Sequence, residues 1–251
     1  MSENKKRIVI IGATSAIAEH CARLWVKEKV VDLTLVGRDL GKTERVATDL
    51  RVRSPQSVIR VLEANFIDPC AVRQLVDGIV SGGAVHTVLI AHGYLPDQTV
   101  CQEDLIGCYD ALTANGISPV LFAEAFAGHM EKANDGALAI IGSVAGDRGR
   151  KSNYVYGAAK GLVTRYAQGL QHRLASTGVK VVLLKPGPTD TPMTSHLKQQ
   201  GGRLANVDDV ARLIVKGITQ GKAVVYVPGK WSLIMMIIRH LPNLIFNKMN
   251  I

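Results

Sequence analysis

Tyr156 and Lys160 lie four residues apart in the stretch SVAGDRGRKSNYVYGAAKG, residues 143–161. A helix places residues at this spacing on one face, so the ammonium of Lys160 would lie beside the phenol of Tyr156. A free tyrosine has a pKa near ~10, and a neighbouring ammonium lowers it by stabilising the phenolate. The pair therefore predicts a group that exchanges a proton with a reacting oxygen. Because the same spacing also occurs by chance on surface helices, the surrounding elements decide between the two interpretations.

The elements alternate along the chain. Strands are predicted over 7–12, 31–38, 57–64, 85–93, 136–143, 179–187 and 223–229. Helices are predicted over 15–29, 41–53, 68–82, 103–132, 152–176 and 207–218, the third starting at Asp68 and Pro69. Strands that are apolar on both faces and separated by helices are typical of a parallel sheet covered on both sides. We therefore predict a single doubly wound Rossmann-type α/β domain over residues 1–229, with about seven strands, followed by a tail over 230–251.

The composition excludes several classes of protein. The net charge is +9, but the basic residues are scattered and aromatic residues make up only 5%, which argues against nucleic-acid binding. The four cysteines, Cys21, Cys70, Cys101 and Cys108, have no metal-ligand spacing, so we predict no metal site. The N-terminal residues lack a secretory apolar segment, which predicts a cytoplasmic protein with reduced thiols.

Two strand ends carry residues suited to binding phosphate groups. The first strand runs into GATSAIA, where Gly12, Thr14, Ser15, Ala16 and Ile17 would bring backbone N–H groups to a pyrophosphate at a helix N-terminus. Ala16 and Ala18 replace two glycines that are usual in this turn. The second strand ends at LVGRD, where Arg38 would bind a 2′-phosphate and so favours NADP(H) over NAD. Asp39 is interpreted as the cap of the next helix.

The ordered set of motifs resembles the short-chain dehydrogenase/reductase family over nearly the whole chain. The resemblance rests on the glycine turn, Asn115, Ser143, Tyr156 with Lys160, and PGPTDT after the sixth strand. It implies that Tyr156 transfers the proton, that Lys160 also binds the nicotinamide ribose, and that Ser143 holds the substrate oxygen. It further implies that Asn115 holds a water linked to Lys160. Tyr154 is interpreted as structural.

The resemblance also implies the remaining cofactor contacts. They are Asn65 and Phe66 at the adenine, Ala91, His92 and Gly93 after the fourth strand, and Pro186, Gly187, Thr189 and Thr191 near the nicotinamide. His92 departs from the family pattern and is either a polar group near the cofactor or a satisfied core histidine. We expect an NADPH-dependent oxidoreductase acting on a carbonyl or alcohol. The alternatives are a non-catalytic NADP(H)-binding regulator of the same fold and a membrane-recruited partner that acts through its tail.

The tail is strongly apolar but is interrupted by Arg239, His240 and Pro242, so it is too short to span a bilayer. It is expected either to pack on the substrate cleft or a second subunit, or to lie on a membrane surface. Together with the Ala91-His92-Gly93 variant, it more loosely resembles the keto-reductase subunit of decaprenylphosphoryl-ribose 2-epimerisation, which implies a lipid-linked keto-sugar as substrate. The family's dimers form through the two long helices, which implies a homodimer or homotetramer.

Overall fold

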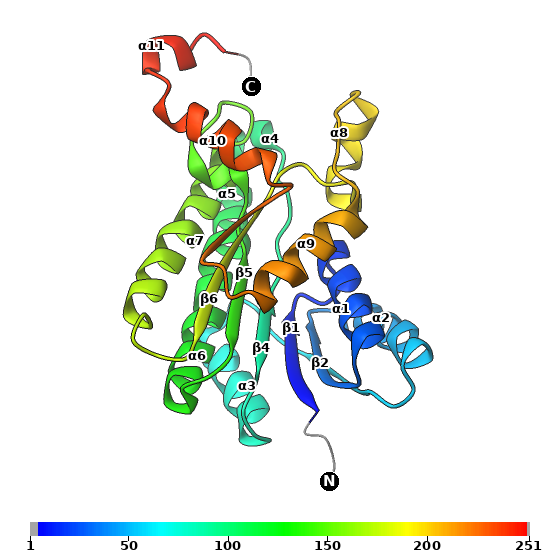
Figure 1. The fold of residues 1–251 in the computed structure, drawn as a ribbon. Coiled ribbons are helices and arrows are strands. Elements are labelled where there is room, and N and C mark those ends of the chain that lie inside the picture. The colour runs from blue at the N-terminus through cyan, green and yellow to red at the C-terminus, as the bar shows by residue number, and fades with distance from the viewer. Residues whose placement is uncertain (1–4, 250–251) are drawn as a thin grey trace.

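The structure is a computed structural model and describes residues 5–249 (Figure 1). Within this range a single sheet has seven parallel strands in the order β3-β2-β1-β4-β5-β6-β7. The strands are β1 (Lys6–Ile11), β2 (Val31–Gly37), β3 (Val58–Glu63), β4 (Thr87–Ile90), β5 (Ala137–Ile141), β6 (Lys180–Pro186) and β7 (Val224–Val227). The chain builds outward from β1 to β3 and then returns to β4 on the other side of β1. The strand order reverses between β1 and β4, which is where open parallel sheets bind their ligands.

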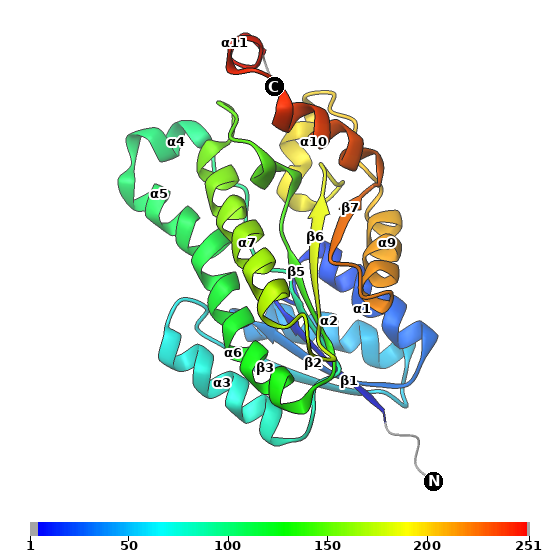
Figure 2. The same cartoon turned by 60° about the vertical axis from the view of Figure 1, so that its left-hand side comes forward.

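Helices cover both faces of the sheet, as the sequence predicted (Figures 1 and 2). One face is packed by α1 (Ala16–Glu28), α2 (Leu40–Arg53) and α9 (Val207–Thr219). The other is packed by α3 (Pro69–Ser81), α6 (Ser118–Ala133) and α7 (Tyr154–Arg173). Side chains from both faces of the strands are buried in these two layers, which explains why the strands are apolar throughout. The predicted fold class is thus confirmed.

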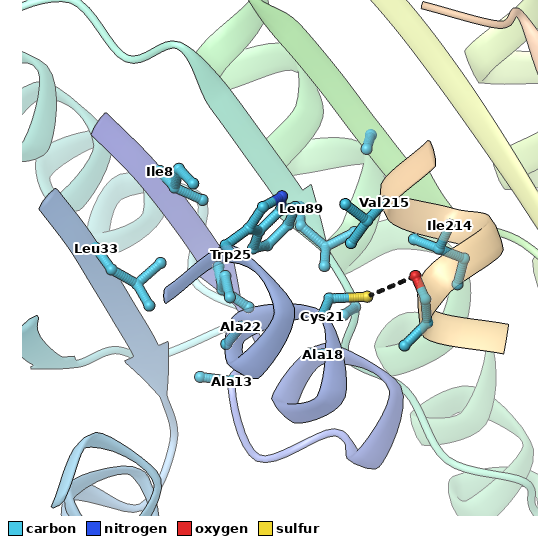
Figure 3. Close-up of a cluster of buried hydrophobic side chains, with 14 of the residues drawn as sticks. Ile8, Ala13, Ala18, Cys21, Ala22, Trp25, Leu33, Leu89, Ile214 and Val215 are labelled. Carbon is cyan, nitrogen blue, oxygen red and sulfur yellow. Dashed lines mark hydrogen bonds between the residues drawn. The ribbon is translucent and has the colours of Figure 1, made fainter. Parts of the chain in front are cut away.

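Buried apolar side chains hold α1 against the sheet and α9 (Figure 3). Cys21 and Trp25 are buried between the sheet and α9, and the thiol of Cys21 lies 3.9 Å from the carbonyl oxygen of Ala211. Burial raises the pKa of this thiol, so it stays protonated. Ala18, which stands where a glycine is usual, is fully buried in the same cluster. Its methyl group therefore fills core space and does not obstruct the turn before α1.

The predicted helix over 103–132 is confirmed as a continuous helical region over 105–133, which also contains a π-helical turn that the sequence did not indicate. The structure has α4 (Gln98–Glu103), α5 (Leu105–Leu112), a π-helical turn (Thr113–Ile117) and then α6. Asp104 separates α4 from this region, because its carboxylate accepts hydrogen bonds from the N–H groups of Ile106 and Gly107 and so starts α5. The short helix α4 was not predicted. Asp68 caps α3 as predicted, with Pro69 in its first turn.

The tail forms two helices, α10 (Lys230–His240) and α11 (Asn243–Phe246), which are separated at Pro242 as expected. They lie at the same end of the molecule as α8 (Ser195–Gln199), beyond the carboxyl ends of the strands (Figure 1). Arg148 holds them in place, because its guanidinium donates to the carbonyl oxygens of Ile238 and Leu241 at 2.6 Å and stacks 3.7 Å from the ring of Phe246. No helix in residues 5–249 is long and apolar enough to cross a bilayer.

Candidate active site

Two adjoining cavities open at the carboxyl edge of the sheet, one with about 840 Å³ of empty space and the other with about 1090 Å³. We call them the catalytic cavity and the phosphate cavity. Both are lined by Ser15, Ile17, His92, Gly93, Thr191 and Met193. The catalytic cavity adds Ala91, Ser143, Tyr156, Lys160, Pro186, Gly187 and Thr189, and the phosphate cavity adds Gly12, Thr14, Ala16, Arg38 and Phe66. Because they share a wall, an extended ligand can occupy both.

The turn after β1 needs glycine at position 12. Gly12 has φ +83°, and a Cβ there would lie 2.6 Å from the backbone nitrogen of His92. The N–H groups of Gly12 and Ala13 both donate to the carbonyl oxygen of Val36, which fixes the turn against β2. Ser15 is the N-cap of α1, yet within the described chain its hydroxyl makes no capping hydrogen bond. This hydroxyl and the first N–H groups of α1 are therefore available to an anion in the phosphate cavity.

Arg38 is exposed at the end of β2 and lines the phosphate cavity. Among the described residues its guanidinium has no hydrogen bond or ion pair. Asp39 caps α2 as predicted, accepting a hydrogen bond from the N–H of Lys42 at 2.8 Å. The ammonium of Lys42 lies 3.6 Å from the carboxylate of Asp39. Arg38 is thus the cation at this strand end that no carboxylate neutralises.

Gly93 brings the backbone after β4 close to Asn115. The φ of Gly93 is +151°, and a Cβ there would lie 2.7 Å from Oδ1 of Asn115. Asn115 is completely buried in the π-helical turn, where Oδ1 accepts from the N–H of Tyr94 at 2.8 Å and Nδ2 donates to the carbonyl oxygen of Ala111. Single π-helical turns within α-helices are frequent at functional sites. Asn115 therefore lies behind the catalytic cavity and holds the loop that forms its wall.

Ser143 follows β5, and Tyr156 projects from the first turn of α7 toward it. Burial raises the pKa of Tyr156 to about 12, while a hydrogen bond with the hydroxyl of Ser143 acts in the opposite direction. The sequence predicted that Lys160 lowers the pKa of this phenol. In the structure the effect of burial is larger, so the expected acidification is wrong.

Lys160 is buried one turn further along α7, on the same side as Tyr156. Its ammonium donates to the carbonyl oxygen of Ile141 at 3.1 Å and lies 5.8 Å from the centre of the Tyr156 ring. Burial lowers the pKa of Lys160 to about 8, because little solvent surrounds the charge. This lysine therefore titrates close to neutral pH.

His92 packs edge-on against Phe66, with ring centres 4.7 Å apart, and its Nε2 lies 2.8 Å from the hydroxyl of Ser118. That hydroxyl donates its proton to the carbonyl oxygen of Phe66 at 2.6 Å, so Nε2 must be the donor to Ser118. Burial lowers the pKa of His92 to about 3, so the ring is neutral. Its Nδ1 is buried without a hydrogen-bond partner in the part of the chain described. Both interpretations of His92 thus apply in part, since the ring is packed like a core residue and also lines both cavities.

The turn after β6 is held against the tail. The N–H of Gly187 donates to the carbonyl oxygen of Val227 at 2.9 Å, and a Cβ on Gly187 would lie 1.9 Å from Nε1 of Trp231. Thr189 is buried and donates to the carbonyl oxygen of Gly187, whereas the hydroxyl of Thr191 lies 3.2 Å from that of Thr194. The tail helix α10 is therefore part of the structure that shapes the catalytic cavity.

One predicted contact lies apart from the others. Asn65 is exposed outside both cavities, and its Oδ1 accepts a hydrogen bond from the N–H of Ile67 at 3.0 Å. Its neighbour Phe66 does line the phosphate cavity. Other residues that line the catalytic cavity were not predicted, including Leu95, Val144, Arg150, Asn153 and Leu197. Of these, only Arg150 and Asn153 could have been recognised from the sequence, because they are polar residues between Ser143 and Tyr156.

Known proteins resemble this chain over most of its length. Residues 6–202 match the family model described as short chain dehydrogenase. The chain is 26% identical over 245 residues to an uncharacterized oxidoreductase of Streptomyces coelicolor, covering 97% of this chain and 96% of that protein. It is 28% identical over 243 residues to one of Mycobacterium tuberculosis, covering 96% of each.

A solved structure shows the same fold. It is a short-chain dehydrogenase from Sphingobium yanoikuyae in complex with NADPH, with a TM-score of 0.81, 22% sequence identity, and coverage of 98% of this chain and 96% of that one. Because the family model matches most of the chain, this chain belongs to the short-chain dehydrogenase family and is an oxidoreductase.

Proposed function

We propose that this protein uses NADPH to reduce a ketone, with Tyr156 as the proton donor. The observation that carries the proposal is the catalytic cavity, which places Ser143, Tyr156 and Lys160 around one space that continues into the phosphate cavity. The NADPH held by the related structure from Sphingobium yanoikuyae supports the same choice of cofactor.

The residues of the phosphate cavity fit a dinucleotide phosphate. Gly12 keeps the turn free of a side chain, and the N-terminus of α1 supplies N–H groups to a pyrophosphate. Arg38 has the planar donors that bind a phosphate in two places, which favours NADP(H) over NAD. When bound, this cofactor supplies the hydride that the carbonyl carbon accepts. Thr191 and the backbone after β6 would hold its nicotinamide end.

Tyr156 is well suited to giving a proton to a carbonyl oxygen. Since its pKa is raised to about 12, the phenol is protonated at neutral pH. Donation of the proton leaves a phenolate, which the positive charge of the nearby Lys160 stabilises. Ser143 donates a hydrogen bond that holds the substrate oxygen in line with Tyr156. Lys160 is fully protonated, and so stabilises the phenolate most, only below its pKa of about 8.

A non-catalytic NADP(H)-binding regulator is the less favoured alternative. A protein that only binds NADP(H) would need the phosphate cavity. It would not need the phenol of Tyr156, the hydroxyl of Ser143 and the buried ammonium of Lys160 around the catalytic cavity.

The substitution Tyr156→Phe separates the two functions. It should abolish NADPH oxidation with a ketone while leaving NADPH binding nearly unchanged, and Lys160→Ala should impair both. The matched control is Tyr154→Phe, an exposed tyrosine in the same helical turn. Wild-type turnover by Tyr156→Phe would contradict the assignment.

We further propose a specific substrate class, a lipid-linked keto-sugar that reaches the enzyme at a membrane surface. Its support is the outer face of the tail, where Leu233, Ile237, Leu244 and Ile245 are more than half exposed (60%, 54%, 83% and 53%). Burying such side chains contributes about 1.5–3 kcal/mol each, which is enough for peripheral anchoring at a cytoplasmic membrane face. Lys230, Arg239 and Lys248 would add attraction to anionic lipids.

Truncation after Gly229 is a poor test of this proposal, because it also removes Trp231 from its contact with Gly187. A variant with Leu233, Ile237 and Leu244 changed to serine keeps the inner face of the tail intact. It should lose co-sedimentation with anionic vesicles at low salt while still binding NADPH. If the wild-type protein does not sediment with these vesicles, the tail is a packing element and the lipid-linked substrate loses its main support.

A homodimer or homotetramer is proposed from the helices α5 and α7. Leu105, Ile106 and Tyr109 on α5 are 81%, 74% and 65% exposed, and Leu162 on α7 is 43% exposed. Apolar surface of this kind is usually covered by a partner, and closed two-fold symmetry is the commonest arrangement. Light scattering during gel filtration tests this, since a monomeric mass at micromolar concentration would contradict the proposal.

A further inference from the structure

Arg150 is a cation in the wall of the catalytic cavity that the proton-transfer chemistry does not use. It lies in the loop between β5 and α7 and lines the same space as Ser143 and Tyr156. One of its terminal nitrogens, Nη2, lies 3.6 Å from the sulfur of Met235 on α10. Its Nε is buried and has no hydrogen-bond partner in residues 5–249. A thioether is a weak acceptor, so the guanidinium is poorly satisfied.

The nearest carboxylate is already bound elsewhere. Asp147 attracts Arg150 electrostatically, but its carboxylate forms an ion pair with Lys185 and accepts a hydrogen bond from the hydroxyl of Tyr226 at 2.8 Å. The described residues that line the catalytic cavity include no aspartate or glutamate, while Lys160 is a second cation there. A guanidinium remains charged at any pH the protein meets. Burying it without a counter-charge costs free energy, and an anion bound in the cavity would supply that counter-charge.

Asn153 supplies a second unsatisfied group on the same wall. It stands directly before α7, but its side chain makes no capping hydrogen bond, and its Oδ1 is buried without a partner in the described chain. A buried carbonyl oxygen and a buried N–H donor whose residues line one cavity offer both kinds of hydrogen bond to one ligand. Hydroxyl groups donate to such an oxygen, and oxyanions accept from such a guanidinium.

We infer that Arg150 binds an anionic oxygen group of the substrate, a carboxylate or a phosphate, and that Asn153 accepts a hydrogen bond from a hydroxyl beside it. The inference rests on the proposed reductase function, because it names the substrate class of that same cavity. The anion lies on the Arg150 side of the cavity, and the carbonyl lies at Ser143 and Tyr156. The enzyme therefore selects a ketone that carries a negative charge and rejects its neutral analogue.

The first experiment measures NADPH oxidation with matched substrates. One pair is a keto-acid and its methyl ester, and the other is a phosphorylated keto-sugar and its dephosphorylated form, so the two arms distinguish carboxylate from phosphate. Wild-type enzyme should show kcat/KM higher by about 10- to 100-fold for the charged member of at least one pair, as expected for hydrogen bonds between charged groups. In Arg150→Met this ratio should collapse toward one. Lys151→Met is the control, because it removes an exposed charge one residue further on, outside the catalytic cavity.

The second experiment needs no turnover. With saturating NADPH present to occupy the phosphate cavity, inorganic phosphate and malonate are each added at constant ionic strength, and the melting temperature is recorded. At least one of the two should stabilise the wild-type protein and Lys151→Met but not Arg150→Met. Equal losses by Arg150→Met on charged and neutral substrates, or identical anion effects on all three proteins, would overturn the inference. A failure of NADPH itself to bind would instead contradict the proposed function, so the two failures are distinguishable.

Discussion

The substitution Gly93→Ala tests whether the backbone between the two cavities must lack a side chain. The φ of Gly93 is +151°, which residues with a Cβ rarely adopt, and the new methyl group would lie 2.7 Å from Oδ1 of Asn115. Asn115 cannot move toward solvent, because it is completely buried and bonded on both sides. The loop after β4 must therefore shift, which breaks the hydrogen bond from the N–H of Tyr94.

The expected cost follows from these two effects. A strained backbone conformation costs about 1–3 kcal/mol, and a lost buried hydrogen bond about 0.5–1.5 kcal/mol. Their sum lowers the free energy of unfolding by roughly 1.5–4.5 kcal/mol. For a chain of this size, each kcal/mol changes the melting temperature by roughly 2–4 °C, so a decrease of roughly 3–18 °C is expected.

The assay combines thermal unfolding with a fluorescence titration of NADPH. Gly93→Ala should also weaken NADPH binding, since the displaced loop lines both cavities. Gly128→Ala is the control, because this glycine lies in α6 and a Cβ there meets nothing within 4 Å. Removing a helical glycine should leave stability unchanged or raise it by about 0.5–1 kcal/mol. If Gly93→Ala melts within a degree of wild type and binds NADPH equally well, the close approach to Asn115 is not a constraint.

Three further predictions concern charge. Arg38→Met should weaken NADPH binding by about 10- to 150-fold and NADH binding far less, and isothermal titration would contradict this if wild type bound both cofactors equally. Because the pKa of Lys160 is lowered to about 8, its charge is present at lower pH and lost above, so ketone reduction should fall by roughly tenfold per pH unit above that midpoint. A flat profile between about pH 7 and pH 10 would refute it. The side chains of Asp147 and Lys185 form an ion pair and are only 2% and 4% exposed. Asp147→Asn leaves the charge of Lys185 unpaired, so it should lower the free energy of unfolding in urea by about 3–5 kcal/mol. The control, Asp135→Asn at an exposed aspartate, should change stability by less than about 0.5 kcal/mol.

The fold was predictable because the central strands are buried on both faces and several helices carry a start signal in the sequence. Asp39 and Asp68 cap α2 and α3 in the structure as their positions in the sequence indicated. The helix α4 was missed because it has only six residues, too few to show an apolar periodicity.

The site was predictable where it depends on local motifs and not where it depends on distant packing. The spacing of Tyr156 and Lys160 placed both on one side of α7, but the sign of the pKa shift at Tyr156 depends on how much protein surrounds the ring. Burial of this kind is a property of the assembled fold. Arg150 was missed for the same reason, since its environment includes Met235, which lies far along the chain on α10.

The tail illustrates why composition alone left two interpretations open. Its apolar residues divide between two faces of α10, so that Met235 is completely buried while Leu233 and Ile237 are exposed. The inner face contacts Arg150 through Met235 and the turn at Gly187 through Trp231. Packing on the cleft therefore accounts for part of the apolar surface and leaves the rest for a membrane or a second subunit. The same short helix that offers Leu233 and Ile237 to such a partner also places Met235 against Arg150 in the wall of the catalytic cavity.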